Sequence, residues 1–226
     1  MKLTKINNLI TSCRLCPRLV EFREKIAKEK RKQYLNEIYW GKPITGYGDH
    51  NAKLLMIGLA PAAHGGNRTG RVFTGDKSAD FLFKCLFEAG FSNQPISINT
   101  KDGLKLNNLY LTTALKCVPP GDKPNSTELK TCFRYFQKEI ECLSKINTLV
   151  ALGKIAFDAC LNFYKQQFII KNKDYVFKHG GEYLLPDNKI LIGCYHPSPR
   201  NVNTGRIDQK KMVKLLIDVK SIIERR

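Results

Sequence analysis

The chain has 226 residues, which suits one domain with a substantial core and leaves little room for two independent ones. Hydrophobic residues make up 42% of it and aromatic residues 10%, which excludes a disordered chain. Its 38 Lys and Arg residues outnumber 20 Asp and Glu, and the net charge of +18 favours a polyanionic partner. A membrane surface or plain solubility are the alternative explanations of this charge.

The positive charge gathers toward both ends of the chain. Residues 1–40 hold 10 basic and 4 acidic side chains, and residues 200–226 hold 8 and 3. Contact with nucleic acid is therefore expected to involve the ends, although the basic run at residues 25–32 is equally consistent with the solvated face of a helix. Residues 1–10 lack the apolar run of a signal peptide or a membrane span, so we expect a cytoplasmic protein with no membrane partner.

Four short apolar runs have the character of buried strands. They lie at residues 53–58, 109–115, 149–152 and 190–195. Runs of this length are typical of parallel strands that are covered on both faces.

Helical patterns follow these runs. Apolar residues at spacings of three and four predict a helix that begins near Ser78. Asn125 and Glu128 have the spacing of a capping box and predict the start of the next helix. Two more helices are expected near residues 156–163 and 212–223.

A strand followed by a helix, four times over, predicts an α/β fold. We expect a three-layer α/β/α sandwich around a central four-stranded parallel sheet. Residues 92–107 and 165–188 fall outside this alternation and are interpreted as insertions or hairpins. No linker divides the chain, so residues 1–226 are expected to form a single domain.

Unusual residues follow the first, second and fourth of these strands. The stretches at residues 58–76, 116–125 and 196–206 are rich in Gly, Pro, His or Asn. Because ligands in open α/β sheets bind at the carboxyl ends of strands, the site is expected there.

The first stretch contains part of the pattern of a phosphate-binding loop. Gly65 and Gly70 have the glycine spacing of that motif. Arg71 and Val72 stand where the motif needs Lys and then Ser or Thr. A nucleotide hydrolase is therefore not expected.

Three side chains in these stretches are candidates for function. Phe73 offers an aromatic face on which a planar base could stack, but a core aromatic that anchors the loop is the simpler interpretation. Asp76 could serve catalysis or cap the helix that follows it. His196 directly follows a strand, so its imidazole is expected at the rim of the site, as either a catalytic or a structural group.

The eight cysteines divide into two sets of four. Cys13 and Cys16 form a C-x2-C pair that suits a shared metal, and Cys117 and Cys132 could complete four thiolates. The others lie in apolar patterns, where a buried reduced thiol is expected: Cys85, Cys142, Cys160 and Cys194. Zinc and an iron-sulfur cluster both accept four thiolates, and the spacing does not choose between them.

Three features together resemble the family 5 (type B) uracil-DNA glycosylases. They are the string GLAPAAHGGNRTGRVFTGD at residues 58–76, HPSPRN at residues 196–201 with the NTGR that follows, and the first set of cysteines. Family 4 glycosylases share the cysteines but carry a carboxylate where this chain has Leu59. The resemblance spans roughly residues 10–210. It implies the α/β/α uracil-glycosylase fold, removal of uracil from DNA, and a 4Fe-4S cluster on Cys13, Cys16, Cys117 and Cys132 that ties in the N-terminal segment.

The resemblance also implies roles for individual residues. Asp76 would orient or deprotonate the attacking water, and His196 would donate a hydrogen bond to the departing base. The base would leave the duplex and stack on Phe73. Its other neighbours would be Leu59, Ala60, Ala63 and Thr113. The DNA contacts would be Arg68, Arg71, Arg200, Asn201 and Arg206.

The expected partner is damaged DNA, single- or double-stranded, bound by a monomer, with replication or repair proteins as further partners. Some relatives present an Asn where this chain has Thr112 and Thr113, so removal of other deaminated bases such as hypoxanthine is expected as well. One alternative is a non-enzymatic, metal-stabilised nucleic-acid-binding protein. Another is a hydrolase or transferase that acts on free nucleosides.

Overall fold

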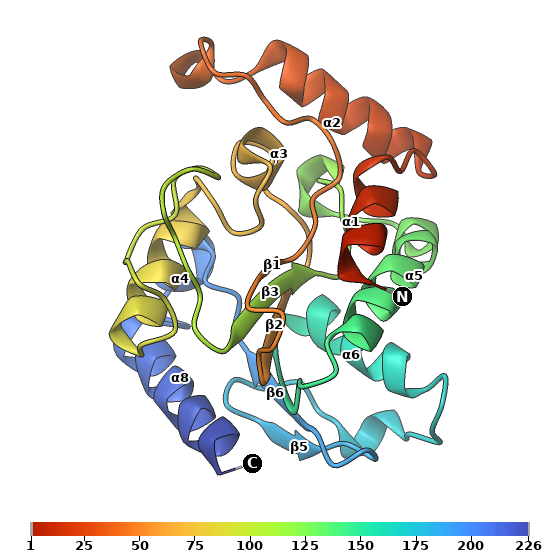
Figure 1. Cartoon of the computed structure of the whole chain (residues 1–226), viewed down its shortest axis with the longest axis vertical. Coiled ribbons are helices and arrows are strands. Elements are labelled where there is room, and N and C mark those ends of the chain that lie inside the picture. The colour runs from red at the N-terminus through yellow and green to blue at the C-terminus, as the bar shows by residue number, and fades with distance from the viewer. Residues whose placement is uncertain (1, 226) are drawn as a thin grey trace.

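The computed structural model describes residues 2–225 around a six-stranded sheet of order β1-β3-β2-β4-β6-β5 (Figure 1). Its four central strands are parallel and almost wholly buried: β2 (Leu54–Gly58), β3 (Leu109–Thr113), β4 (Thr148–Leu152) and β6 (Ile190–Cys194). Each lies within two residues of the strand that its apolar run predicted.

Two short antiparallel strands extend the sheet beyond the four that were expected. β1 (Tyr47–Gly48) pairs with β3, and β5 (Glu182–Leu184) pairs with β6. The expected strand number was wrong because segments of two and three residues are too short to show an alternating pattern. Residues 165–188, interpreted as an insertion or a hairpin, contain β5, which forms an antiparallel hairpin with β6.

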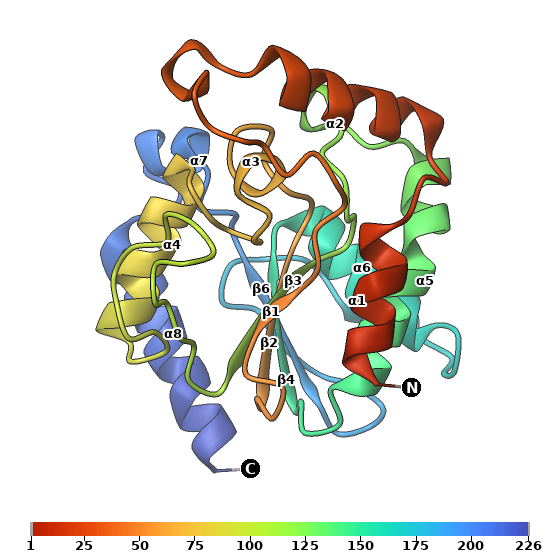
Figure 2. The ribbon, with the colours of Figure 1, turned by 45° about the horizontal axis from the view of Figure 1, so that its top comes forward.

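Helices cover both faces of the sheet, which confirms the three-layer arrangement (Figure 2). On one face α4 (Lys77–Glu88) packs against α8 (Gln209–Glu224). The other face carries α1 (Leu3–Thr11), α5 (Ser126–Cys142) and α6 (Lys154–Tyr164). Each layer therefore has its own apolar core against the sheet, and the layers hold the parallel strands in register.

The capping residues at the start of α4 and α5 explain where these helices begin. Asp76 caps α4, and Asn125 forms the predicted capping box with Glu128 at the start of α5. Within the described part of the chain, no helix is both long and apolar enough to cross a membrane.

The remaining helices gather at one end of the molecule. α3 (Gly66–Thr69) and α7 (Pro199–Asn203) follow β2 and β6, so they lie at the carboxyl ends of the parallel strands. α2 (Pro17–Glu29) lies beyond α3 in both views (Figures 1 and 2). Single turns complete the chain: η1 (Lys32–Tyr34), η2 (Pro120–Asp122) and η3 (Asn172–Asp174).

Candidate active site

A cleft of about 720 Å³ opens at the carboxyl ends of the four parallel strands. Its walls come from the segments that follow the four strands, together with Leu152 at the end of β4 and Ser78 in α4. The lining residues are Leu59, Ala60, Pro61, Ala62, Ser78, Pro119, Asp122, residues 152–156, His196, Ser198, Pro199, Arg200 and Arg206. This is the place where open α/β sheets bind ligands, and the volume is in the range of small-molecule sites.

His196 lines the cleft directly after β6. Burial lowers the pKa of His196, and nearby Asp122 opposes this shift. The imidazole is therefore neutral at neutral pH and carries one N–H donor. Asn201 Nδ2 donates to the carbonyl oxygen of His196 at 2.8 Å. The ring of the preceding residue, Tyr195, stacks on His179 with centroids 5.3 Å apart.

Asp76 caps α4 immediately beside the cleft. Its Oδ1 accepts hydrogen bonds from the backbone N–H groups of Ser78 and Ala79 at 3.0 and 3.1 Å. Ser78 in turn lines the cleft, whereas Asp76 itself does not. Burial raises the pKa of Asp76, and the two backbone donors lower it in part. The capping interpretation is thus confirmed, and the other carboxylate oxygen takes no part in the cap.

Gly65 lies against that second oxygen. An ideal Cβ atom on Gly65 would lie 2.1 Å from Oδ2 of Asp76, so the loop can pass this close only because residue 65 is glycine. The backbone of the loop after β2 therefore covers one side of the carboxylate.

Phe73 belongs to the core. Its side chain is 9% exposed and packs within the cluster between the sheet and the α4–α8 layer. The ring lies over Gly58 at the end of β2, where a Cβ atom would come within 2.6 Å of it. The backbone of Phe73 has φ +48°, a strained conformation for an aromatic residue. The simpler interpretation of Phe73 is therefore the one the structure bears out, and Phe73 does not line the cleft.

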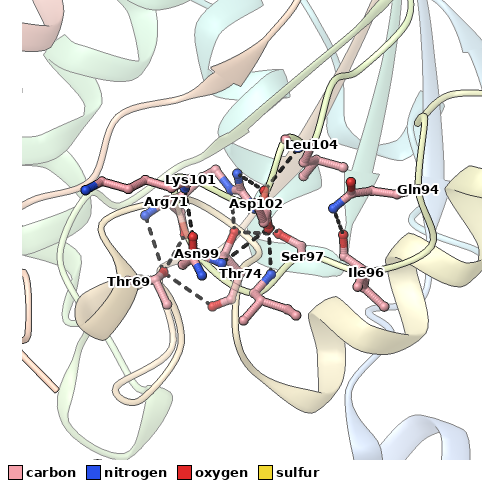
Figure 3. Close-up of polar contacts among 12 residues, drawn as sticks. Thr69, Arg71, Thr74, Gln94, Ile96, Ser97, Asn99, Lys101, Asp102 and Leu104 are labelled. Carbon is pink, nitrogen blue, oxygen red and sulfur yellow. Dashed lines mark hydrogen bonds and ion pairs between the residues drawn. The ribbon is translucent and has the colours of Figure 1, made fainter. Parts of the chain in front are cut away.

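Arg71 is buried in the protein interior, where it has no surface for the expected phosphate contact. Its side chain is 5% exposed and forms an ion pair with Asp102 at 2.6 Å. It also donates to Thr74 Oγ1 and Ser97 Oγ, each at 2.9 Å (Figure 3). The network fastens the loop that follows β2 to the segment of residues 92–107.

Asp102→Asn is expected to lower the free energy of unfolding by about 3 kcal/mol, because it leaves the buried Arg71 guanidinium without its counter-charge. Burial would raise the pKa of Asp102, but hydrogen bonds from Arg71 and from backbone N–H groups outweigh it and lower the pKa. The wild-type carboxylate thus stabilises the fold above the unfolded pKa of about 3.9, and this contribution disappears as the pH falls through the folded-state pKa.

Urea unfolding at pH 7 and at pH 3 measures both effects. The difference between wild type and variant should shrink at the lower pH. Asp218→Asn, which removes an exposed carboxylate from its pair with Lys214, should change the free energy of unfolding by less than about 1 kcal/mol. Equal effects of the two substitutions would contradict a buried, structural Arg71–Asp102 pair.

Arg68 is also turned inward, so its expected phosphate contact is wrong in this structure. Its side chain is 7% exposed. The guanidinium pairs with Glu37 at 2.5 Å, donates to the carbonyl oxygen of Gly75 at 2.9 Å, and lies 3.9 Å from the centroid of the Tyr34 ring. It joins α3 to the segment that follows α2.

The other predicted residues divide between the cleft and the protein interior. Leu59, Ala60, Arg200 and Arg206 line the cleft, and both arginines are exposed. Ala63 and Thr113 do not line it, and Thr113 is buried in β3. Asn201 donates from its side-chain Nδ2 to the carbonyl oxygen of His196 and from its backbone N–H to Ser198 Oγ.

The four cysteines of the predicted metal set line one cavity, away from the cleft: Cys13, Cys16, Cys117 and Cys132. The other four cysteines lie outside this cavity. Burial raises the pKa of Cys132 to about 12, so this thiol needs a bound cation to become a thiolate at neutral pH. Among residues 2–225, no three Cys, His, Asp or Glu side chains are close enough to hold a single metal ion.

Hydrogen-bond donors point at the sulfur atoms of this cavity. Arg23 Nη1 lies 3.0 Å from Cys117 Sγ, and the backbone N–H of Lys116 donates to Cys132 Sγ at 3.2 Å. Arg23 is buried, and its Nε is one of the few buried polar atoms in the described chain without a partner. A cationic wall with an unused donor suits an electron-rich group held between the four sulfurs.

Comparison with known proteins identifies the family. The profile of the "Uracil DNA glycosylase superfamily" matches residues 45–220. A curated type-5 uracil-DNA glycosylase from Thermus thermophilus is 43% identical over 213 residues, which covers 94% of each chain. The chain belongs to the type-5 uracil-DNA glycosylase family.

Two further type-5 relatives agree with this assignment. The one from Pyrobaculum aerophilum is 42% identical over 209 residues and covers 92% of this chain and 88% of its own. The one from Mycobacterium leprae is 40% identical over 219 residues and covers 96% and 94%. The type-5 family inferred from the motif at residues 58–76 is thereby confirmed.

Sequence reasoning missed the part of the cleft that follows β4. Gly153, Lys154 and Ile155 line the cleft, and Gly153 has φ +97°. A glycine directly after a buried strand was the available signal, since a backbone turn of this sign favours glycine. The stretch lacks the Pro, His and Asn residues that mark the other three loops.

Proposed function

We propose that the protein is a DNA repair glycosylase that takes uracil out of the DNA stack and hydrolyses its N-glycosidic bond, which leaves an abasic site. The observation that carries the proposal is the single cleft lined by both family motifs, residues 59–62 on one wall and His196 on another. Asp76 lies directly behind Ser78 in the same wall region.

Cleavage of the bond builds positive charge on the sugar and negative charge on the departing base. We assign the stabilisation of the positive charge to Asp76, whose Oδ2 takes no part in the helix cap and would orient or deprotonate the attacking water. Its Oδ1 is fixed by two backbone N–H groups, so the carboxylate keeps one orientation without reorganising during the reaction.

We assign the stabilisation of the negative charge on the departing base to His196. A neutral imidazole with one N–H can donate a hydrogen bond to a carbonyl oxygen of the base as negative charge develops there. Burial keeps the ring neutral, and Asn201 holds its backbone in place. Arg200 and Arg206, exposed at the edge of the cleft, would contact DNA phosphates.

Selectivity for the base would come from backbone groups of residues 59–62 and not from Thr112 and Thr113. Thr112 Oγ1 donates to Glu139 at 2.8 Å, and neither Thr112 nor Thr113 lines the cleft. The base would instead meet backbone groups of residues 59–62, which can also accept a related deaminated base such as hypoxanthine.

A labelled uracil-containing oligonucleotide tests the proposed function. After incubation with the protein, alkali should cut the strand at the uracil position, in a duplex and in a parallel single-stranded sample. Binding without strand cleavage would support the non-enzymatic alternative. Activity on free nucleosides alone would support the nucleoside hydrolase or transferase.

We further propose that Cys13, Cys16, Cys117 and Cys132 hold a 4Fe-4S cluster. The four cysteines line one cavity, where Arg23 Nη1 lies 3.0 Å from Cys117 Sγ and Arg23 Nε has no partner among the described residues. A cluster with inorganic sulfides would accept hydrogen bonds from this cationic side. Its role would be structural, because it would join α2 and the segment before it to the loop after β3 within the single domain of residues 1–226.

Cys117→Ser is expected to remove most of the bound iron. The wild-type protein, purified without oxygen, should be brown, absorb near about 400 nm and hold about four iron atoms per chain. Iron content and absorbance measure the loss, and Cys85→Ala is the matched control, since Cys85 is buried in α4 outside the cavity. A colourless wild-type protein that contains zinc would contradict the cluster.

A further inference from the structure

The segment that follows α2 is fixed in position although it contributes little to the core. α2 ends at Glu29, and its C-cap Lys30 has φ +56°, which turns the chain sharply. Residues 30–41, here called the arm, then pass over α3 (Figure 2). Trp40 N donates to the Arg68 carbonyl oxygen at 2.9 Å, and Gly41 N donates to that of Asn67 at 3.0 Å.

Side chains add to this attachment. Arg68 pairs with Glu37 and lies over the Tyr34 ring, while the Tyr39 hydroxyl lies 3.0 Å from His64 Nδ1. The arm is therefore attached to the same loop whose first residues, 59–62, line the cleft. Both views place it at the end of the molecule that carries α3, far from the C terminus (Figures 1 and 2).

The arm and the last turn of α2 carry exposed cations and exposed apolar groups. Lys28 in the last turn of α2, Arg31 and Lys32 are exposed, and among residues 2–225 no ion pair involves them. Ile38 is 95% exposed and Leu35 is 55% exposed. A fixed segment with free cations and an unburied isoleucine has the composition of a surface that meets nucleic acid.

From this geometry we infer that the arm, together with the last turn of α2, is a second DNA-binding element, which holds the duplex beside the extruded base. Lys28, Arg31 and Lys32 contact phosphates, and Ile38 packs against the sugars or bases of the flanking pairs. The inference rests on the proposed function. It also explains the role of Arg68, which would hold the arm in position through its pair with Glu37 instead of contacting phosphate itself.

The first test is a charge-removal variant, Lys28→Ala/Arg31→Ala/Lys32→Ala, bound to a duplex with a tetrahydrofuran abasic-site analogue. Each lost phosphate contact should reduce the slope of log Kd against log salt concentration by about 0.9, and Kd at physiological salt should rise at least about tenfold. Lys165→Ala/Lys171→Ala/Lys173→Ala is the matched control, because these exposed lysines lie after α6, far from the arm (Figures 1 and 2).

The second test is Ile38→Ala, which should raise Kd about tenfold and leave the salt slope unchanged, because no charge is removed. Ile169→Ala is its control, since Ile169 is 99% exposed but lies after α6. If both arm variants keep the Kd and the salt slope of the wild type, the inference is overturned. In that case, release of uracil by the wild-type protein would still support the proposed function. A wild-type protein that neither binds this duplex nor releases uracil would overturn both.

Discussion

Asp76→Asn is expected to slow the release of uracil by about a thousandfold. The substitution removes the negative charge that we assign to the water and the sugar, but the asparagine oxygen can still accept the hydrogen bonds from Ser78 and Ala79. The start of α4 should therefore survive, and DNA affinity should remain close to that of wild type.

Single-turnover cleavage of a uracil duplex measures this effect. Because burial raises the pKa of Asp76, the wild-type rate should fall on acidification at a pH above the ordinary carboxyl value of about 3.9, and this acid limb should be missing in the variant. Asp80→Asn removes an exposed carboxylate from the same turn of α4 and should keep the wild-type rate. An unchanged rate in Asp76→Asn would refute the catalytic assignment.

Lys116→Met should cause the largest loss of stability, about 3–5 kcal/mol in the free energy of unfolding. The Lys116 ammonium is paired with Glu139 in the protein interior and also donates to Thr112 Oγ1 at 2.7 Å. Glu139 Oε1 accepts from the backbone N–H of Gly46 at 3.0 Å. Without its partner, the Glu139 carboxylate remains buried and uncompensated.

The double variant Lys116→Met/Glu139→Leu shows whether the loss of stability comes from the unpaired Glu139 carboxylate or from lost packing. It should recover most of the stability, since apolar residues often replace a buried ion pair at little cost. Lys154→Met breaks the exposed pair with Asp158 and should cost at most about 1 kcal/mol in urea unfolding. A double variant as unstable as Lys116→Met would show that the loss does not come from the charge.

The central fold could be predicted from sequence because its signals are local. Buried parallel strands give continuous apolar runs, and a residue such as Asn125 marks the start of a helix with its own side chain. The edge strands could not be found this way, because β1 and β5 are defined by their pairing with β3 and β6 rather than by their own residues.

The site could be predicted only in part, for a similar reason. The motifs indicated which loops meet at the cleft, but not which way each side chain turns. Arg71 has the residue type of a phosphate ligand, yet its side chain is buried in an ion pair with Asp102, 31 residues away in the chain. Phe73 likewise packs over Gly58 instead of facing the cleft. Such outcomes depend on partners that are distant in the chain.

The close approach of Gly65 to Asp76 limits how the family motif can diverge. Any larger residue at position 65 would push the carboxylate off its helix or move the loop, because its Cβ would overlap Oδ2. We therefore expect homologues that keep the Asp76 cap to keep glycine at position 65, and a homologue with alanine there to hold the loop or the carboxylate in another place.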